Sequence, residues 1–282
     1  MSASSLVTAA EATAAERQQP TAAVMAPLLT GDRFRPERYH FFSVLDSTNR
    51  QAAQWARAGA PEGTVVVADQ QTAGRGRLGR HWSSPAGVNL YCSIVLRPAL
   101  SPREVAQLTL LTGLVLARTV TGMGVAGVEI KWPNDLLLNG RKLAGILTEA
   151  RMDSSGVQYV VVGIGINLNG TDALLPPELR GKAIHLADVL RGMVDRPRFL
   201  ADLLAQFERG YGRFCQQGFG PLREEWLAFS RLLGRPVQVR MAAESFAGQA
   251  LALDNEGCLL VQRADGTLTR VVAGDILFTE DE

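Results

Sequence analysis

The stretch Gln71-Thr72-Ala73-Gly74-Arg75-Gly76-Arg77-Leu78-Gly79-Arg80 holds three glycines and three arginines within its last seven residues. Apolar runs with the character of β-strands precede it at Thr64–Ala68 and follow it at Asn89–Leu96. Glycine adopts positive φ freely and guanidinium groups bind anions, so the pattern predicts a mobile basic loop that closes over phosphates or carboxylates. A disordered RNA-contacting tail is the alternative, but this segment occurs once and lies between two strands.

The composition indicates a folded protein whose basic character is local. Of the 282 residues, 46% are hydrophobic and 20% charged, which suits one large domain with or without a small companion. The formal net charge of +1 argues against nucleic-acid binding, because such domains usually carry a clear basic excess. No apolar stretch is long enough to span a bilayer, so we expect no membrane association.

The cysteines and histidines predict neither a disulfide framework nor a zinc site. Cys92, Cys215 and Cys258 are widely spaced without a CxxC pair, and the three histidines do not cluster with them. Free thiols of this kind are typical of a reducing compartment, and we expect a cytoplasmic protein.

Two polar clusters stand out as candidate binding sites. Asp46-Ser47-Thr48-Asn49 joins a predicted strand, Tyr39–Leu45, to a predicted helix, Arg50–Ala58. Capping the helix requires only one of these side chains, so the others suggest a site for a small polar ligand, although capping alone remains possible. The second cluster, Lys131-Trp132-Pro133-Asn134-Asp135, precedes a hairpin turn at Asn139-Gly140.

The second cluster displays Asn134 and Asp135 at the end of a strand, with Lys142 nearby across the hairpin. Turn residues with a surface lysine are the alternative interpretation, but Asn139-Gly140 already supplies the turn. Farther along, the predicted strand Tyr159–Leu168 alternates glycines with apolar residues, so one face lacks side chains and a flat group can approach it.

The remaining elements are expected to be scaffold. Ser101-Pro102-Arg103-Glu104 is a capping box that predicts the start of a core helix through Ala117. After Gly234, short alternating strands predict a small β-barrel. Further helices are predicted at 184–191, 197–215 and 219–233. The predicted domains are a poorly ordered Ala/Thr-rich extension at 1–37, a large domain with the candidate binding sites at 38–233 and a barrel at 234–282.

Taken together and in order, these motifs resemble those of the biotin protein ligases. The resemblance rests on Asp46–Asn49, Gln71–Arg80, Lys131–Asp135, Arg141–Leu147 and Gly163–Asn167. It implies an α+β fold, with a class II synthetase-like mixed sheet flanked by helices and a C-terminal SH3-like barrel. It also implies a reaction in which biotin and ATP form biotinyl-5′-AMP, which then acylates a lysine of a biotin carboxyl carrier protein, with Mg²⁺ assisting.

The resemblance also implies roles for individual residues. Those expected to bind biotin are Ser47, Thr48, Asn49, Gln71, Arg75, Gly76, Arg77 and Lys142. Those expected to serve the nucleotide are Arg75, Trp82, Asn134, Asp135 and Asn167, with Asp135 also the magnesium ligand. The expected catalytic residues are Arg75, Arg77, Lys142 and Asp135.

The chemistry of these side chains agrees with that assignment. Joining a carboxylate to a triphosphate brings two anions together, and Arg75, Arg77 and Lys142 supply fixed positive charge. Magnesium prefers oxygen ligands, and Asp135 offers one. No dedicated general base for the transfer step is evident, and Asp135 is only a candidate.

Other functions remain to be weighed. A lipoate or octanoyl ligase shares the catalytic fold, but its usual glycine-rich and histidine motif is absent. A non-catalytic biotin sensor is disfavoured because both Asp135 and Lys142 are present. The residues before Tyr39 are too few and too rich in Ala and Thr for a helix-turn-helix, so we expect no operator binding. Either a monomer or a homodimer fits the sequence.

Overall fold

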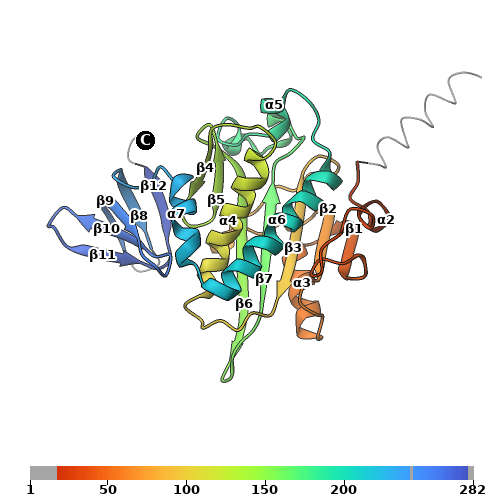
Figure 1. Ribbon diagram of the computed structural model, residues 1–282. Coiled ribbons are helices and arrows are strands. Elements are labelled where there is room, and N and C mark those ends of the chain that lie inside the picture. Colours follow the sequence, from red (N-terminus) through yellow and green to blue (C-terminus); the bar gives the residue numbers. More distant parts are fainter. Residues whose placement is uncertain (1–17, 242–243, 279–282) are drawn as a thin grey trace, which may run out of the picture.

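The chain folds into a large mixed β-sheet with helices and a smaller all-β part at its C-terminal end (Figure 1). The computed structural model describes residues 18–241 and 244–278. The large sheet has seven strands in the order β1-β2-β3-β7-β6-β5-β4, and the smaller sheet has five. This arrangement confirms the predicted α+β class.

The seven strands of the large sheet are β1 (Tyr39–Leu45), β2 (Val65–Gln71), β3 (Leu90–Leu96), β4 (Val128–Lys131), β5 (Asp135–Leu138), β6 (Arg141–Asp153) and β7 (Gly156–Ile166). β1 and β2 are parallel, and all other neighbouring pairs are antiparallel. β3 is buried along its whole length, as its continuous apolar run indicates. The predicted Asn139-Gly140 turn joins β5 to β6, and both residues have positive φ, at 51° and 75°.

Helices cover both faces of the large sheet. The α-helices are α2 (Ala22–Met25), α3 (Thr48–Arg57), α4 (Val105–Thr121), α5 (Leu186–Leu190), α6 (Arg196–Gln217) and α7 (Gly220–Ala228). Short 3-10 turns lie at Pro36–Arg38, Arg77–Gly79, Asp172–Leu174 and Pro177–Leu179. α3 packs on β2, β3 and β7, whereas α4 packs on β4 to β7 and is itself covered by α6 and α7 (Figure 1).

The C-terminal sheet lies beside α7 and β4 at one end of the molecule (Figure 1). Its strands are β8 (Pro236–Arg240), β9 (Ser245–Leu253), β10 (Leu259–Arg263), β11 (Leu268–Val271) and β12 (Asp275–Phe278), in the order β11-β10-β9-β8-β12. β12 was not predicted, because four residues close to the chain end carry little pattern. Trp132 is buried and donates a hydrogen bond from Nε1 to the Gly257 carbonyl at 3.1 Å, which ties this sheet to the larger one.

Two helix boundaries differ from the prediction by more than two residues. The segment starting at Ser101 forms a turn, in which the Ser101 N–H donates to the Glu104 carboxylate at 2.8 Å, and α4 begins only at Val105. α7 ends at Ala228 rather than at residue 233, because the next carbonyl, of Phe229, accepts a hydrogen bond from Ile130 N at 2.9 Å. That contact draws the chain onto the edge of β4.

The predicted N-terminal extension is only partly described. Residues 1–17 lie outside the described part, so the expectation of loose order there stays a prediction. Residues 18–37, in contrast, pack on the domain, because Met25 and Phe34 are buried and the Tyr39 hydroxyl donates to the Pro20 carbonyl. Leu29 is buried as well, so three apolar side chains of this segment belong to the core. Among the described residues, no helix has the length and apolar character needed to cross a bilayer.

A buried histidine, His185, is expected to make the stability of the fold depend on pH. His185 is fully buried, and neither of its ring nitrogens makes a hydrogen bond in the described structure. Burial lowers the pKa of His185, although Asp188 and Asp172 oppose the shift. The unfolded chain therefore takes up a proton more readily than the folded chain, so stability is complete above the unfolded pKa and is lost as the pH falls below it.

We expect the free energy of unfolding to decrease below about pH 6.5, by up to about 1.4 kcal/mol per pH unit for this group. His40 adds to the trend, because burial lowers its pKa too. Urea unfolding of His185→Leu at several pH values should show a shallower dependence of the unfolding free energy on pH than the parent chain shows. An unchanged slope in His185→Leu would contradict the assignment.

Candidate functional site

The glycine-arginine segment forms a compact loop directly after β2. Gly76 N donates to the Arg80 carbonyl at 2.7 Å, and Trp82 N donates to the Gly74 carbonyl at 3.0 Å. Leu78 and Gly79 turn the chain with φ of 55° and 74°. These internal hydrogen bonds distinguish the loop from a disordered tail.

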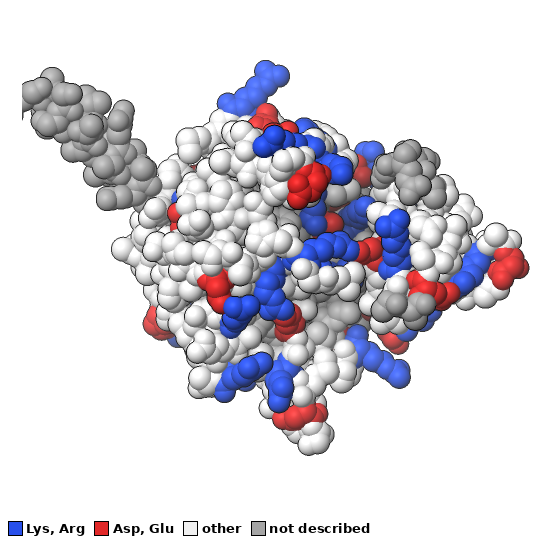
Figure 2. Space-filling view, turned by 180° about the vertical axis from the view of Figure 1, so that it is seen from behind, with Lys and Arg blue, Asp and Glu red and all other residues white. Residues whose placement is uncertain are grey.

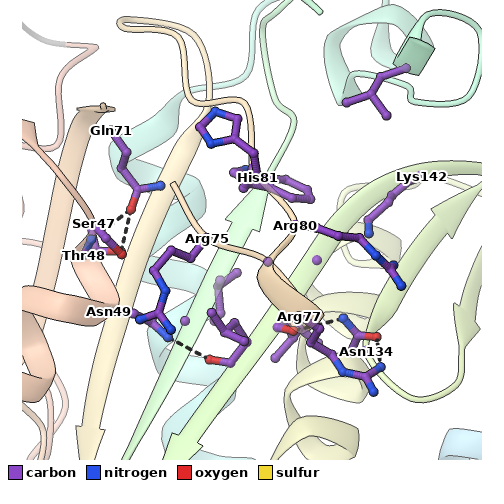
Figure 3. A pocket seen from close by; sticks show the side chains of 18 residues that line it. Ser47, Thr48, Asn49, Gln71, Arg75, Arg77, Arg80, His81, Asn134 and Lys142 are labelled. Carbon is purple, nitrogen blue, oxygen red and sulfur yellow. Dashed lines mark hydrogen bonds between the residues drawn. The ribbon is translucent and has the colours of Figure 1, made fainter. Parts of the chain in front are cut away.

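One cavity of about 240 Å³ lies between this loop, the start of α3, and strands β6 and β7 (Figure 3). The predicted site residues that line it are Ser47, Thr48, Asn49, Gln71, Arg75, Gly76, Arg77, Trp82, Asn134 and Lys142. Asp135 and Asn167 do not line this cavity. The structure thus brings together most of the residues selected from separate parts of the sequence.

The polar wall of the cavity is built where α3 meets β2. The Thr48 N–H donates to Gln71 Oε1 at 2.9 Å, so the strand supplies the acceptor that an N-cap side chain would otherwise provide. The Gln71 amide is fixed in turn by Ser84 Oγ, 2.9 Å from its Nε2. The Ser47 hydroxyl makes no hydrogen bond to any described residue, although the residue is 1% exposed and lines the cavity. It is therefore available to a ligand.

Sequence reasoning missed Ser93, a residue of β3 that makes hydrogen bonds to two side chains of this wall. Its Oγ lies 2.8 Å from Thr48 Oγ1 and 2.6 Å from Asn49 Oδ1, and the residue is fully buried. A single serine within the apolar run of β3 carries no distinguishing signal. Only the packing of α3 on β3 reveals its role.

Glycines on β6 and β7 form the floor of the cavity, as the predicted bare strand face required. A Cβ atom at Gly165 would stand 2.5 Å from Trp82 Nε1, and one at Gly145 would stand 2.8 Å from the same indole. The flat group that approaches the bare face is thus Trp82 of the same chain. At Gly163 an added Cβ would lie 1.9 Å from Asn49 Oδ1.

Gly163→Ala is therefore expected to displace the Asn49 side chain and to weaken ligand binding in this cavity by about 10- to 100-fold. The matched control is Gly212→Ala on α6, where an added Cβ meets no atom within 4 Å and φ is not positive. Calorimetric titration of both variants with biotin, the ligand that the sequence resemblance implies, measures the effect. Equal affinities would show that Asn49 does not contact the ligand.

Four cationic side chains line the cavity: Arg75, Arg77 and Arg80 from the loop and Lys142 from β6 (Figure 3). Arg77 donates to Asn134 Oδ1 at 2.9 Å and to the Gly274 carbonyl at 3.2 Å. Burial lowers the pKa of the Arg77 guanidinium, and the charge of Asp135 opposes that shift. Lys142 Nζ stands 5.4 Å from the centroid of the Trp82 ring. The concentration of positive charge suits an anionic ligand.

The C-terminal sheet also contacts the loop, which sequence reasoning did not anticipate. Asp275, at the start of β12, forms ion pairs with Arg77, at 3.5 Å, and with Arg80. Both arginines line the cavity. The last strand of the small sheet thus helps to hold the loop in place.

Asp135 lies beneath Lys142, with its Oδ1 2.8 Å from Nζ. The geometry is that of an ion pair without a directed hydrogen bond, because this buried oxygen has no hydrogen-bond partner in the described structure. Among the described residues, no group of three or more His, Cys, Asp or Glu side chains could enclose a metal ion. A cation held mainly by ligand oxygens and water requires only one or two carboxylates, and Asp135 fits that need.

Asn167 belongs to a second, smaller cavity of about 100 Å³ next to the first. Trp82 and Lys142 line both cavities and stand between them. Leu175 and Leu179 give the second cavity an apolar wall. Of the residues predicted to bind nucleotide, Arg75, Trp82 and Asn134 therefore border the first cavity, and Trp82 and Asn167 border the second.

Comparison with known proteins follows the same division of the chain. Residues 41–167 match the Biotin/lipoate A/B protein ligase family, and residues 232–279 match the Biotin protein ligase C terminal domain. The biotin--[acetyl-CoA-carboxylase] ligase of Paracoccus denitrificans is 37% identical over 244 residues, which cover 83% of this chain and 97% of that protein.

Two further relatives extend the comparison. The bifunctional ligase/repressor BirA of Bacillus subtilis is 37% identical over 238 residues, covering 84% of this chain and 72% of that protein. The structure of the biotin protein ligase from Aquifex aeolicus in complex with biotin and ATP aligns with a TM-score of 0.72 at 27% identity. That alignment covers 85% of this chain and 97% of the Aquifex chain. With its cavity, its C-terminal sheet and these relatives, the chain belongs to the biotin protein ligase family.

Proposed function

We propose that this chain is a biotin--[acetyl-CoA-carboxylase] ligase that forms biotinyl-5′-AMP from biotin and ATP and then transfers biotin to a lysine of the carrier. Such ligase activity is that of its family. The observation that carries the proposal is the shared cavity, where a polar wall meets the side chains of Arg75, Arg77 and Lys142. A small ligand with a polar ring and an acid group matches these two ends.

The polar wall is proposed to bind biotin. Ser47 offers a hydroxyl that makes no hydrogen bond to any described residue. The side chains of Thr48, Asn49 and Gln71 are held by hydrogen bonds to neighbouring side chains. Such preorganised groups select for a ligand with matching donors and acceptors. Gly76 keeps the loop backbone close to the cavity.

The cationic end is proposed to carry out adenylation. An oxygen of the biotin carboxylate forms a bond to the α-phosphorus of ATP, and the bond from that phosphorus to pyrophosphate breaks. Both reactants are anionic, so Arg75, Arg77 and Lys142 reduce their repulsion and stabilise the negative charge that develops. Asn134 positions Arg77 through its 2.9 Å hydrogen bond, a role that adds to its predicted place in the nucleotide site.

The nucleotide and its metal are assigned to the neighbouring groups. Asp135 would hold Mg²⁺, since its carboxylate lies next to the cavity, with its Oδ1 2.8 Å from Lys142 Nζ. When bound, Mg²⁺ neutralises charge on the phosphates. Trp82 and Asn167 would receive the adenine end, because the second cavity adjoins the first at Trp82.

In the transfer step, the neutral amine of the carrier lysine attacks the acyl carbon of the adenylate, AMP leaves, and the amine loses a proton. Asp135 is the candidate acceptor of that proton. It is a weak candidate while its partner is Lys142 at 2.8 Å. The closed loop protects the adenylate from water until the carrier arrives.

Pyrophosphate release in the presence of biotin and ATP tests the proposal. Biotin should support release and also raise the melting temperature of the chain, whereas lipoate should do neither. Release with lipoate or octanoate alone would indicate the alternative ligase. Biotin binding without release would indicate a sensor.

The remaining expectations concern the setting of the enzyme. Among the described residues, Cys92, Cys215 and Cys258 are free thiols, as suits the cytoplasm. The partner is proposed to be the biotin carboxyl carrier domain of acetyl-CoA carboxylase or of a related carboxylase, and neither nucleic acid nor membrane is proposed. A monomer and a homodimer both remain compatible with the fold.

A further inference from the structure

Glu149 on β6 connects the basic loop to the polar wall. Its carboxylate forms a two-point contact with Arg75, with Oε1 2.7 Å from Nη2 and Oε2 3.2 Å from Nη1. The same Oε2 accepts a hydrogen bond from Asn49 Nδ2 at 3.0 Å. One side chain thus contacts both the first arginine of the loop and an amide beside the ligand cavity.

The contact to Asn49 completes the hydrogen bonding of that amide. Asn49 Nδ2 also donates to the Leu147 carbonyl at 3.0 Å, and Oδ1 lies 2.6 Å from Ser93 Oγ. An amide nitrogen has two N–H groups, and the carbonyl and Glu149 accept both. Because an ionised carboxylate can only accept, Glu149 keeps the nitrogen on its side and Oδ1 turned toward Ser93.

Glu149 lines a groove that is separate from the cavity. It is the only carboxylate among the residues lining that groove. Four arginines line the same groove: Arg50, Arg57, Arg75 and Arg151. Figure 2 shows basic side chains gathered across this face of the molecule, away from α4 and α6.

The ion pair between Arg75 and Glu149 can form and break reversibly, and we call this pair the latch of the loop. The side chains of Arg75 and Glu149 are 42% and 33% exposed, so water and salt weaken their attraction. Such a pair holds the loop in place without preventing Arg75 from turning to an anionic ligand. A fully buried pair would be much more costly to break.

We propose that Glu149 is a positioning residue that couples the position of the loop to recognition of the ligand ring. It acts through Arg75 and Asn49 and does not contact the reacting atoms. The inference rests on the proposed function only for the identity of the ligand, because the latch itself is a property of the unliganded chain.

Limited proteolysis with trypsin tests the latch without any ligand. Trypsin cleaves after arginine, and the loop offers Arg75, Arg77 and Arg80. Glu149→Gln keeps the shape of the side chain but removes its charge, and it should accelerate cleavage within the loop by about five-fold. Glu149→Asp keeps the charge but shortens the reach, and it should give a smaller acceleration. The fragments beginning at Gly76, Leu78 and His81 identify the site by mass spectrometry.

Binding measurements test the coupling. Glu149→Gln should weaken biotin binding by about ten-fold while changing the KM for ATP by less than about two-fold. A merely structural role would alter both equally. The matched control is Glu129→Gln on β4. Glu129 pairs with Arg231 at 3.5 Å and lines neither cavity, so the substitution removes a carboxylate away from the site. This control should leave loop cleavage and biotin affinity unchanged.

The outcomes separate this inference from the proposed function. Unchanged loop cleavage and unchanged biotin affinity in an active Glu149→Gln enzyme would overturn the inference and leave the function intact. Faster loop cleavage in a chain that neither binds biotin nor releases pyrophosphate would support the latch and refute the function. In the Arg75→Ala background, Glu149→Gln should no longer affect cleavage after Arg77, and a persisting effect would overturn the coupling.

Discussion

Lys142→Ala is expected to slow formation of the adenylate by about 100- to 1,000-fold, the usual loss when a positioned donor to developing negative charge is removed. Lys142 lines both cavities, with its Nζ 5.4 Å from the centroid of the Trp82 ring, and among the described residues it is the only lysine that lines the first cavity. The loss should fall on the chemical step, so single-turnover pyrophosphate release is the measurement that reveals it. An unchanged single-turnover rate would contradict the assigned role.

Two companion variants separate charge from packing. Lys142→Met keeps a long apolar side chain beside Trp82 and should be slowed about as much as the alanine variant, because charge carries the effect. Arg141→Ala removes the neighbouring cation on β6, whose side chain points to the opposite face of the strand and lines neither cavity. It should retain nearly full activity.

The parts of the fold that the sequence predicted are those set by local chemistry. The turn at Asn139-Gly140 requires two residues that accept positive φ, and these two supply them. The bare face around Gly163 was evident because glycine alternates there with apolar residues. The identity of the group on that face was not predicted, because it depends on where Trp82 lies after folding.

The missed residues all act across long distances in sequence. Glu149 contacts a loop 74 residues earlier, and the Gly274 carbonyl accepts from Arg77, 197 residues before it. Ser93 is separated from Asn49 by 44 residues. Each is an ordinary residue in its own segment, and no local pattern marks it. Asn134 and Asn167, which the family resemblance assigns to the nucleotide, border two adjoining cavities, and that assignment stays a prediction.

Arg77→Ala is expected to release the adenylate about 10- to 100-fold faster while leaving the unliganded fold largely intact. Arg77 is the loop arginine held from both sides, by Asn134 of the large sheet domain and by Gly274 and Asp275 of the C-terminal sheet. The Arg77 side chain is therefore already fixed before an anionic intermediate forms, so binding that intermediate costs little conformational entropy. Removing it deprives the adenylate of a charged hydrogen bond that the closed loop would otherwise maintain.

The cost to folding should be small by comparison, because a loop arginine contributes little core packing. Loss of its contacts to the C-terminal sheet corresponds to about 1 kcal/mol, or a melting temperature lower by about 2–4 °C. Leu78→Ala, which truncates the 73% exposed neighbour in the same loop, is the matched control and should release no additional adenylate. Trapping of free adenylate with hydroxylamine measures the release, and melting without ligand measures the fold. A large fall in melting temperature, or release equal to that of the parent chain, would mean that Arg77 stabilises the joint between the two sheets and does not retain the intermediate.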